Sequence, residues 1–144
     1  MISPIAPIAA TRRLLIVDDS RADRLLIGSS VRVASGDRYL VDEAENGVQA
    51  LALLKDKAYA GVFLDVRMPG INGFEVLATL RESARTWPMV FMLSSSAHPD
   101  DIARSYDECV TAYLCKPSSL AAMREVVSAC LGLLDSAESV PFPS

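Results

Sequence analysis

The stretch GVFLDVRMPGING, residues 61–73, decides how the rest of the chain is interpreted. It opens with four uncharged residues, continues with a single carboxylate, Asp65, and then passes through a Met-Pro-Gly turn toward a segment of helical periodicity. A short, uninterrupted apolar run is typical of a strand that is buried on both faces, as in parallel sheets. We therefore expect a buried parallel strand here, with Asp65 at its carboxyl end and a loop and a helix after it.

Four further apolar runs of the same character are distributed along the chain. They are Leu14 to Val17, Tyr39 to Val41, Met89 to Leu93 and Ala112 to Leu114. Segments with helical periodicity follow the five runs, at about 21–34, 47–58, 73–84, 99–108 and 118–134. Each segment is long enough to carry a right-handed crossover between parallel strands. The sequence therefore predicts an α/β fold in which five βα units form a five-stranded parallel sheet.

Local signals mark the starts of three of these helices. Asn72, with Glu75 three residues later, resembles a capping box. Asp100 and Asp101 would lie in the first turn of the fourth helix, where carboxylates favour the positive end of the helix dipole. Ser118 and Ser119 are candidate caps for the fifth helix.

Size and composition exclude several classes of protein. A chain of 144 residues corresponds to one domain, and 51% hydrophobic, 22% charged and 6% aromatic residues are typical of a folded globular protein. Lys and Arg number 14 against 18 Asp and Glu, so the net charge is −4 and we expect no nucleic acid partner and no anionic membrane surface. No apolar run approaches the roughly 18 residues of a membrane-spanning helix.

The cysteines and the first ten residues indicate the cellular compartment of the protein. The three cysteines are odd in number and lack CxxC or Cys/His metal spacing, so a reducing cytoplasm fits best. The first ten residues contain two prolines and no basic segment ahead of their apolar residues, which favours a retained tail over a secretory signal. We divide the chain into an N-terminal tail, 1–11, one domain, 12–134, and a C-terminal tail, 135–144.

Polar side chains follow four of the predicted strands. They are Asp18 and Asp19 after the first strand, Asp65 after the third, Ser94 after the fourth and Lys116 after the fifth. In open α/β sheets the functional site lies outside the carboxyl ends of the strands, so these side chains are expected to meet. Carboxylate oxygens are the ligands that Mg²⁺ prefers, and a nearby ammonium can hold an anion. This set of groups fits phosphoryl chemistry.

The ordered combination of these motifs resembles a known family. Asp18-Asp19, the 65–73 segment, Ser94 and the Tyr113-Leu-Cys-Lys116-Pro117 run look like the receiver domain of two-component response regulators, over about 12–134. The resemblance implies a flavodoxin-like, doubly wound (βα)5 fold with strand order 2-1-3-4-5. The run from Ala103 to Tyr106, taken with the segment that ends in Lys116-Pro117, is also similar to small single-domain regulators paired with bacteriophytochrome kinases.

The resemblance also implies a role for each candidate site residue. Asp65 would accept a phosphoryl group from a phosphohistidine on a sensor histidine kinase, and two approaching anions require neutralisation by Mg²⁺ and a positioned ammonium. The implied magnesium ligands are Asp19 and Asp65 directly, Asp18 through metal-bound waters, and the backbone carbonyl of Arg67. Lys116 and Ser94 would contact phosphoryl oxygens. Ser94 is selected among three consecutive serines because it lies 22 residues before Lys116.

A switch is implied as well. In the family, movement of the hydroxyl that corresponds to Ser94 is coupled to the inward turn of an aromatic side chain on the fifth strand, here Tyr113, although Tyr113 could equally be a core residue. The surface that changes is made by the fourth helix, fifth strand and fifth helix. Because about ten residues remain after 134, we expect output through protein contact or phosphate transfer. The Arg67 side chain either reaches toward the phosphoryl group or is solvated.

Three other functions are considered. A pseudo-receiver that only binds partners would not need the acidic pair, Asp65 and Lys116. A dehalogenase-like phosphatase requires a second acid two residues after the nucleophile, where this chain has Arg67. A flavodoxin-like flavin site requires a Ser/Thr/Gly phosphate loop after the first strand, which this chain lacks. His98, the single histidine, excludes a histidine-rich metal site and is expected in a loop near a helix start.

Two further expectations concern particular segments. Cys109 stands where the family usually has a helix-ending glycine, so we expect either a positive φ at Cys109 or a different helix end. The last helix carries one apolar stripe, predicted to be core, at Leu120, Met123, Val127, Leu131 and Leu134, and a second beside it at Ala122, Val126, Ala129 and Leu133. An ordinary surface helix needs only the first stripe. We therefore expect a homodimer through the fourth helix, fifth strand and fifth helix, with at least one tail reaching across the partner. The alternative is a monomer whose tails fold back onto its own fifth helix.

Overall fold

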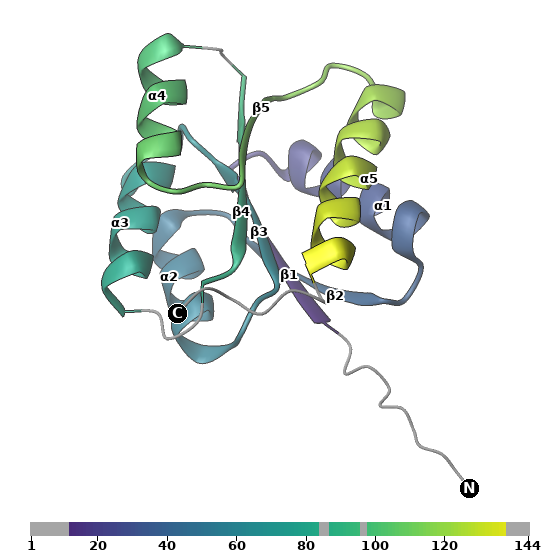
Figure 1. Cartoon of the computed structure of the whole chain (residues 1–144), viewed down its shortest axis with the longest axis horizontal. Helices are drawn as coiled ribbons and strands as arrows, with labels where there is room; N and C mark the ends of the chain where they lie inside the picture. The colour runs from purple at the N-terminus through teal and green to yellow at the C-terminus, as the bar shows by residue number, and fades with distance from the viewer. Residues whose placement is uncertain (1–11, 84–86, 96–97, 138–144) are drawn as a thin grey trace, which may run out of the picture.

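A computed structural model describes residues 12–83, 87–95 and 98–137 of the chain. Its core is one parallel sheet of five strands in the order β2-β1-β3-β4-β5, which confirms the predicted α/β class and strand order (Figure 1). The strands are β1 Arg12–Val17, β2 Tyr39–Ala44, β3 Gly61–Asp65, β4 Met89–Ser94 and β5 Ala112–Cys115. The five predicted apolar runs are therefore the five strands, each extended by one to three residues at its ends.

Five helices follow the strands, one after each, close to the predicted ranges. They are α1 Arg21–Ser35, α2 Gly47–Asp56, α3 Gly73–Ser83, α4 Pro99–Asp107 and α5 Leu120–Ala137. Ser119 precedes α5, and its hydroxyl accepts a hydrogen bond from the Ala122 backbone N–H at 3.1 Å. Of the two serines proposed as caps, Ser119 is therefore the one that caps the helix. Among the described residues, no helix is both long and apolar enough to cross a membrane.

The helices form two layers, with α1 and α5 on one face of the sheet and α2, α3 and α4 on the other (Figure 1). Successive residues of a strand point to opposite faces. Accordingly, Leu15 and Val17 of β1 pack in the core on the α2–α3–α4 side, and Leu14 and Ile16 pack in the core on the α1–α5 side. The central strands are buried on both faces, as the apolar runs predict, whereas the edge strands β2 and β5 are partly exposed.

The helix-start signals are confirmed where the structure describes them. The Asn72 carboxamide oxygen accepts from the Glu75 backbone N–H at 3.0 Å, and a Glu75 carboxylate oxygen accepts from the Asn72 backbone N–H at 3.1 Å. This is the reciprocal pair of a capping box. Asp100 and Asp101 lie in the first turn of α4, and His98 is the residue immediately before that helix.

Cys109 adopts the left-handed backbone conformation, with φ of 63°, as expected for a side chain at a glycine-favouring position. The Val110 N–H donates to the Ser105 carbonyl at 3.2 Å, and the Cys109 N–H donates to the Tyr106 carbonyl at 3.0 Å. These two bonds form a Schellman motif, in which the position of Cys109 is normally glycine. Helix α4 therefore ends as a glycine-terminated helix does, with a cysteine in place of the glycine.

The fifth helix differs from the expectation at both ends. Leu120, predicted to be core, is 43% exposed, because the first turn of α5 lies at the carboxyl edge of the sheet, where the strands have ended. At its other end the helix continues through Ala137, past the predicted end at 134. The remaining predicted core residues of this helix, Met123, Val127, Leu131 and Leu134, are buried. The proposed tail segments 1–11 and 138–144 lie outside the described residues.

Candidate functional site

The side chains that follow the strands do converge at one edge of the sheet. Asp18 comes directly after β1, Asp65 ends β3, and Lys116 follows β5. Asp18 is held at the edge because its backbone N–H donates to the Ala44 carbonyl of β2 at 3.1 Å. Lys116 is fixed in the same way, since its backbone N–H donates to the Ser94 carbonyl of β4 at 2.7 Å. Backbone pairing thus places all three side chains.

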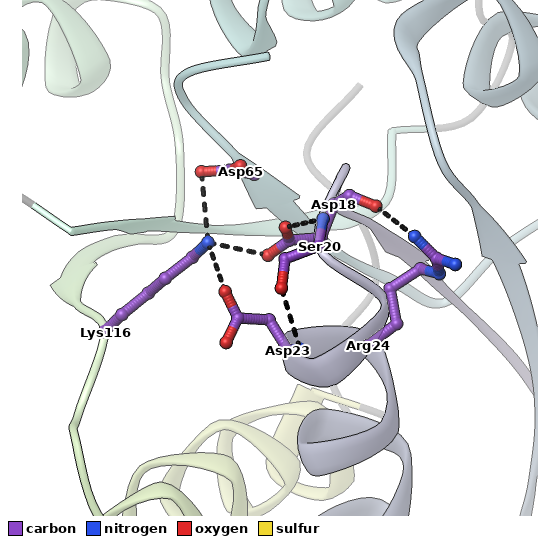
Figure 2. Close-up of polar contacts among 6 residues, drawn as sticks. All are labelled: Asp18, Ser20, Asp23, Arg24, Asp65 and Lys116. Atoms are coloured by element: carbon purple, nitrogen blue, oxygen red, sulfur yellow. Dashed lines mark hydrogen bonds and ion pairs between the residues drawn. The ribbon is translucent and has the colours of Figure 1, made fainter.

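The Lys116 ammonium is the centre of this cluster (Figure 2). Its Nζ lies 2.8 Å from Oδ2 of Asp18, 2.9 Å from Oδ2 of Asp23 and 3.5 Å from Oδ1 of Asp65. Burial lowers the pKa of Lys116, but the contacts with Asp18 and Asp23 and the charge of Asp65 outweigh it and raise the pKa overall. Lys116 is therefore a charged cation held among three carboxylates.

The acidic loop after β1 is rigidly built. The Ser20 backbone N–H donates to Oδ1 of Asp18 at 2.9 Å, and the Ser20 hydroxyl accepts from the Asp23 backbone N–H at 3.2 Å to cap α1. Arg24 donates from Nη1 to the Asp18 backbone carbonyl at 2.7 Å and from Nε to Glu43 of β2 at 3.0 Å. Asp23 and Arg24 are not among the site residues predicted from the sequence. The available signal was their place in the first turn of the helix that follows β1, which starts at the same sheet edge.

Asp65 is a buried member of the cluster, with 4% of its surface exposed. Burial, together with the charge of Asp18, raises the pKa of Asp65 to about 7, although the charge of Lys116 opposes the shift. The Arg67 backbone N–H also donates to the Asp65 carboxylate and favours its charged form. A carboxylate in this setting is destabilised by its surroundings, and a further cation at the site would relieve it.

The loop after Asp65 is packed tightly against the strand. A Cβ atom on Gly73 would lie 2.5 Å from the Asp65 backbone carbonyl oxygen, so only glycine fits where α3 begins. The Gly73 N–H donates to the Val66 carbonyl at 3.0 Å and closes the loop. The Arg67 side chain forms an ion pair with Asp101 of α4. It is thus neither simply solvated nor directed at Asp65 in this structure.

The donor set fits a divalent cation. Asp18, Asp19 and Asp65 each offer a carboxylate oxygen, and these oxygens lie within 4.8 Å of one another. Asp19 is exposed and Asp18 is buried against Lys116 and Ser20. Hard oxygen ligands of this kind and number suit Mg²⁺ or Mn²⁺.

The two proposed switch residues lie on the neighbouring strands β4 and β5. Ser94 is the fully buried last residue of β4, beside β3 in the sheet, where Leu93 pairs with Asp65. Tyr113 of β5 is 9% exposed and belongs to the core cluster on the α2–α3–α4 side. Its backbone N–H donates to the Tyr106 hydroxyl of α4 at 3.4 Å. The Tyr113 side chain is thus in an inward position in this structure.

A parallel sheet of order 2-1-3-4-5 with helices on both faces is the flavodoxin-like architecture. Within it, the chain belongs to the response regulator receiver domain family, whose model matches residues 14–128. The resemblance to receiver domains that the sequence motifs indicate is therefore confirmed. An acidic pocket that binds Mg²⁺ or Mn²⁺ is a property of receiver domains, and the Asp18, Asp19 and Asp65 cluster occupies that pocket.

Curated relatives share the domain but are longer proteins. The gliding motility regulatory protein of Myxococcus xanthus is 34% identical over 112 residues, 77% of this chain and 14% of that protein. The transcriptional regulatory protein TcrA of Mycobacterium tuberculosis is 35% identical over 108 residues, 75% of this chain and 41% of that protein. This chain therefore corresponds to less than half of the length of either relative.

Solved structures of similar length also match. The phosphorylated cyanobacterial phytochrome response regulator RcpA has a TM-score of 0.81 and 27% identity, over 94% of this chain and all of that one. The Mn²⁺-bound form of response regulator Rcp1 has a TM-score of 0.76 and 26% identity, over 92% of this chain and 99% of that one. TrrA of Thermotoga maritima, in complex with Mg²⁺ and BeF, has a TM-score of 0.67 and 29% identity, over 82% and 97% of the two chains.

Proposed function

We propose that this chain is a single-domain response regulator that accepts a phosphoryl group from a sensor histidine kinase onto Asp65. The observation that carries the proposal is the cluster itself, in which the buried Asp65 faces Lys116 and shares an acidic pocket with Asp18 and Asp19. With a divalent cation bound, a pocket with these groups can neutralise an attacking carboxylate and a phosphoryl group at the same time.

In the proposed reaction, an Asp65 carboxylate oxygen forms a bond to phosphorus while the bond between phosphorus and the kinase histidine nitrogen breaks. The histidine nitrogen keeps the bonding electron pair, and the product is an acyl phosphate on Asp65. Lys116 donates a hydrogen bond to one phosphoryl oxygen, and the Ser94 hydroxyl donates to another. Deprotonated Asp65 is the reactive form, so removal of its proton must precede attack.

Mg²⁺ would be held by Asp19 and Asp65 directly, by Asp18 through water molecules and by the backbone carbonyl of Arg67. When bound, it would neutralise charge on the phosphoryl oxygens. Asp18 suits the indirect role because its oxygens already lie close to the Lys116 ammonium and the Ser20 N–H. Exposed Asp19 is the better direct ligand.

The output and the partner are proposed on the same grounds. Phosphorylation would draw the Ser94 hydroxyl toward the phosphoryl group and stabilise the inward Tyr113, which changes the surface of α4, β5 and α5. A bacteriophytochrome is the proposed kinase class, supported by the similarity to RcpA, a cyanobacterial phytochrome response regulator. A reducing cytoplasm remains the proposed compartment, and neither nucleic acid nor a membrane is proposed as a partner.

The test is phosphorylation of the whole chain by a small phosphodonor, acetyl phosphate, with and without Mg²⁺. Intact-mass measurement should show one base-labile phosphoryl group on the wild type in the presence of Mg²⁺ and none on Asp65→Asn. Label on the Asp65→Asn variant, or a wild type that no donor labels, would contradict the assignment.

The competing proposal is a pseudo-receiver that binds partners without phosphorylation. The structure favours the first proposal, because a binding module would have no need to keep a charged lysine among three carboxylates at a buried edge. A chain that binds Mg²⁺ yet is labelled by neither acetyl phosphate nor a kinase would support the pseudo-receiver.

A further inference from the structure

Asp23 is a fourth carboxylate at the acidic edge, outside the residues that define the receiver motif. It lies in the first turn of α1, and its Oδ2 accepts a hydrogen bond from Nζ of Lys116 at 2.9 Å. This contact is shorter than the 3.5 Å between the same Nζ and Asp65. Figure 2 shows the Lys116 side chain extending to a point between Asp18, Asp23 and Asp65.

Hydrogen bonds hold the backbone around Asp23 in place at the start of α1. The Asp23 backbone N–H donates to the Ser20 hydroxyl at 3.2 Å, and the next residue, Arg24, is bonded to the Asp18 backbone carbonyl at 2.7 Å. The side chain of Asp23 is 32% exposed and that of Lys116 is 13% exposed, so the pair is screened only in part. A charge-assisted hydrogen bond between two such groups restrains the long lysine side chain.

The three carboxylates around Lys116 differ in whether they could also hold a divalent cation. Asp18 and Asp65 both belong to the group of carboxylates that could hold a divalent cation, and Asp23 does not. The cation would therefore compete with Lys116 for Asp18 and for Asp65, but not for Asp23. An ammonium has three N–H donors, and Nζ of Lys116 lies within 3.5 Å of an oxygen of each of the three carboxylates, with its hydrogen bond to Asp23. The hydrogen bond to Asp23 can therefore persist while another N–H of the ammonium donates to a phosphoryl oxygen.

We infer that Asp23 is a positioning residue for the phosphotransfer reaction, one that holds the Lys116 ammonium at Asp65 while the cation engages the other carboxylates. The inference rests on the proposed function. Two other roles for Asp23 give different results. A carboxylate that only added negative charge would slow the approach of an anionic donor, so its removal would speed phosphorylation. A carboxylate that only stabilised the start of α1 would affect unfolding and leave the reaction rate unchanged.

The experiment compares Asp23→Asn and Asp23→Ala in the full chain. Both variants remove the charge, but only asparagine keeps an oxygen that can accept from Lys116, so their difference isolates the hydrogen bond. With acetyl phosphate and Mg²⁺, we expect Asp23→Ala to be phosphorylated about tenfold more slowly than the wild type and Asp23→Asn within about threefold. Asp37→Ala is the matched control, because Asp37 is an exposed carboxylate at the far end of α1. It should match the wild type.

A second readout needs neither phosphodonor nor cation. Relaxation of the ¹³Cε nucleus of Lys116 reports how far the ammonium end of the side chain is restrained. We expect greater mobility in Asp23→Ala than in the wild type, intermediate mobility in Asp23→Asn and no change in Asp37→Ala. A stabilising role confined to α1 would change the unfolding temperature and leave this relaxation as it is.

The outcomes separate the two proposals. If the wild type is labelled and both Asp23 variants react as fast as it or faster, or if Lys116 stays equally restrained in Asp23→Ala, the inference is overturned and the proposed function stands. If the wild type is never labelled, the proposed function is overturned and the inference with it. A slower Asp23→Ala with a more mobile Lys116, rescued in part by asparagine, supports the inference.

Discussion

At the scale of single residues, Asp65 shows how a reactive group is kept at the expense of stability. Because burial and the charge of Asp18 raise its pKa to about 7, the folded chain binds a proton at Asp65 more tightly than the unfolded chain does. Between the unfolded value near 4 and the folded value, stability must therefore fall as the pH rises.

The resulting prediction is that Asp65→Asn stabilises the protein without added metal at pH 8, and that the gain disappears below about pH 4, where the wild-type carboxyl is protonated in both states. The gain should be a few kcal/mol at most, because one pKa unit corresponds to about 1.4 kcal/mol and the site is strongly coupled. Urea unfolding of both proteins from pH 4 to 8 measures it. A gain that is independent of pH would contradict this explanation.

The backbone at Cys109 is a second place where a single residue lowers stability. A side chain at a φ of 63° is strained, whereas glycine adopts this conformation at no steric cost. We expect Cys109→Gly to raise the free energy of unfolding by a few tenths to about 1 kcal/mol, the larger entropy of glycine in the unfolded chain offsetting part of the gain. Cys109→Ala is the control, since it removes the thiol and keeps the strain. A clear loss of stability in the glycine variant would refute the strain.

The residues that could be predicted from the sequence share one property. Asp18, Asp65 and Lys116 are placed by strand ends, and strand ends are visible as the ends of apolar runs. Asp23 and Arg24 could not be found in this way, because their contacts with Lys116 and Glu43 join segments that are distant in the chain. Hydrogen bonds of this kind depend on how α1 packs beside the sheet edge, which periodicity does not specify.

At the scale of elements, the end of α5 is attached to the start of β2. The Tyr39 hydroxyl donates to Asp135 at 2.6 Å, and Arg38 forms an ion pair with the same carboxylate at 2.9 Å. Arg12 donates to the Leu134 carbonyl at 3.3 Å, in the last turn of the helix. The predicted helix ends too early, at 134, because the apolar stripe ends at Leu134. Polar groups hold the turn that follows.

We predict that Asp135→Ala lowers the free energy of unfolding by about 1 to 2 kcal/mol, because it leaves the half-buried Tyr39 hydroxyl without its acceptor. Tyr39→Phe should cost less, since it removes the hydroxyl together with its need for a partner. In a double-mutant cycle measured by chemical denaturation, the two changes should be strongly non-additive. Additive effects would mean that the bond contributes nothing to the attachment of α5.

At the scale of the whole molecule, the β5 edge of the sheet is flanked by helices that carry large exposed apolar side chains. Strand β5 is an edge strand between α4 and α5 (Figure 1). Around it lie large exposed side chains, with Tyr106 of α4 53%, Leu133 of α5 48% and Leu120 of α5 43% exposed. The second apolar stripe expected on α5 is thus partly open to solvent. Periodicity predicted that this stripe exists, but no sequence pattern identifies what covers it.

We propose that a second copy of the chain covers this surface of α4, β5 and α5. A two-fold dimer buries the same side chains from both copies at once, so each exposed leucine contributes twice. The prediction is a dimer at tens of micromolar for the full chain in sedimentation, weakened by Leu133→Glu, which places a charge in the interface. Leu25→Glu is the matched control, because Leu25 is 57% exposed on α1, away from β5.

Truncation of the chain tests whether the C-terminal tail contributes to the dimer contact. The cut belongs after Ala137, because Asp135 is needed to hold α5 on β2. If the C-terminal tail reaches across the partner, the shortened chain should dissociate at concentrations where the full chain is dimeric. An unchanged dimer would show that the C-terminal tail does not contribute to the contact. A full-length chain that stays monomeric, with and without phosphorylation, would refute the dimer, and the exposed leucines would then be surface residues of a monomer.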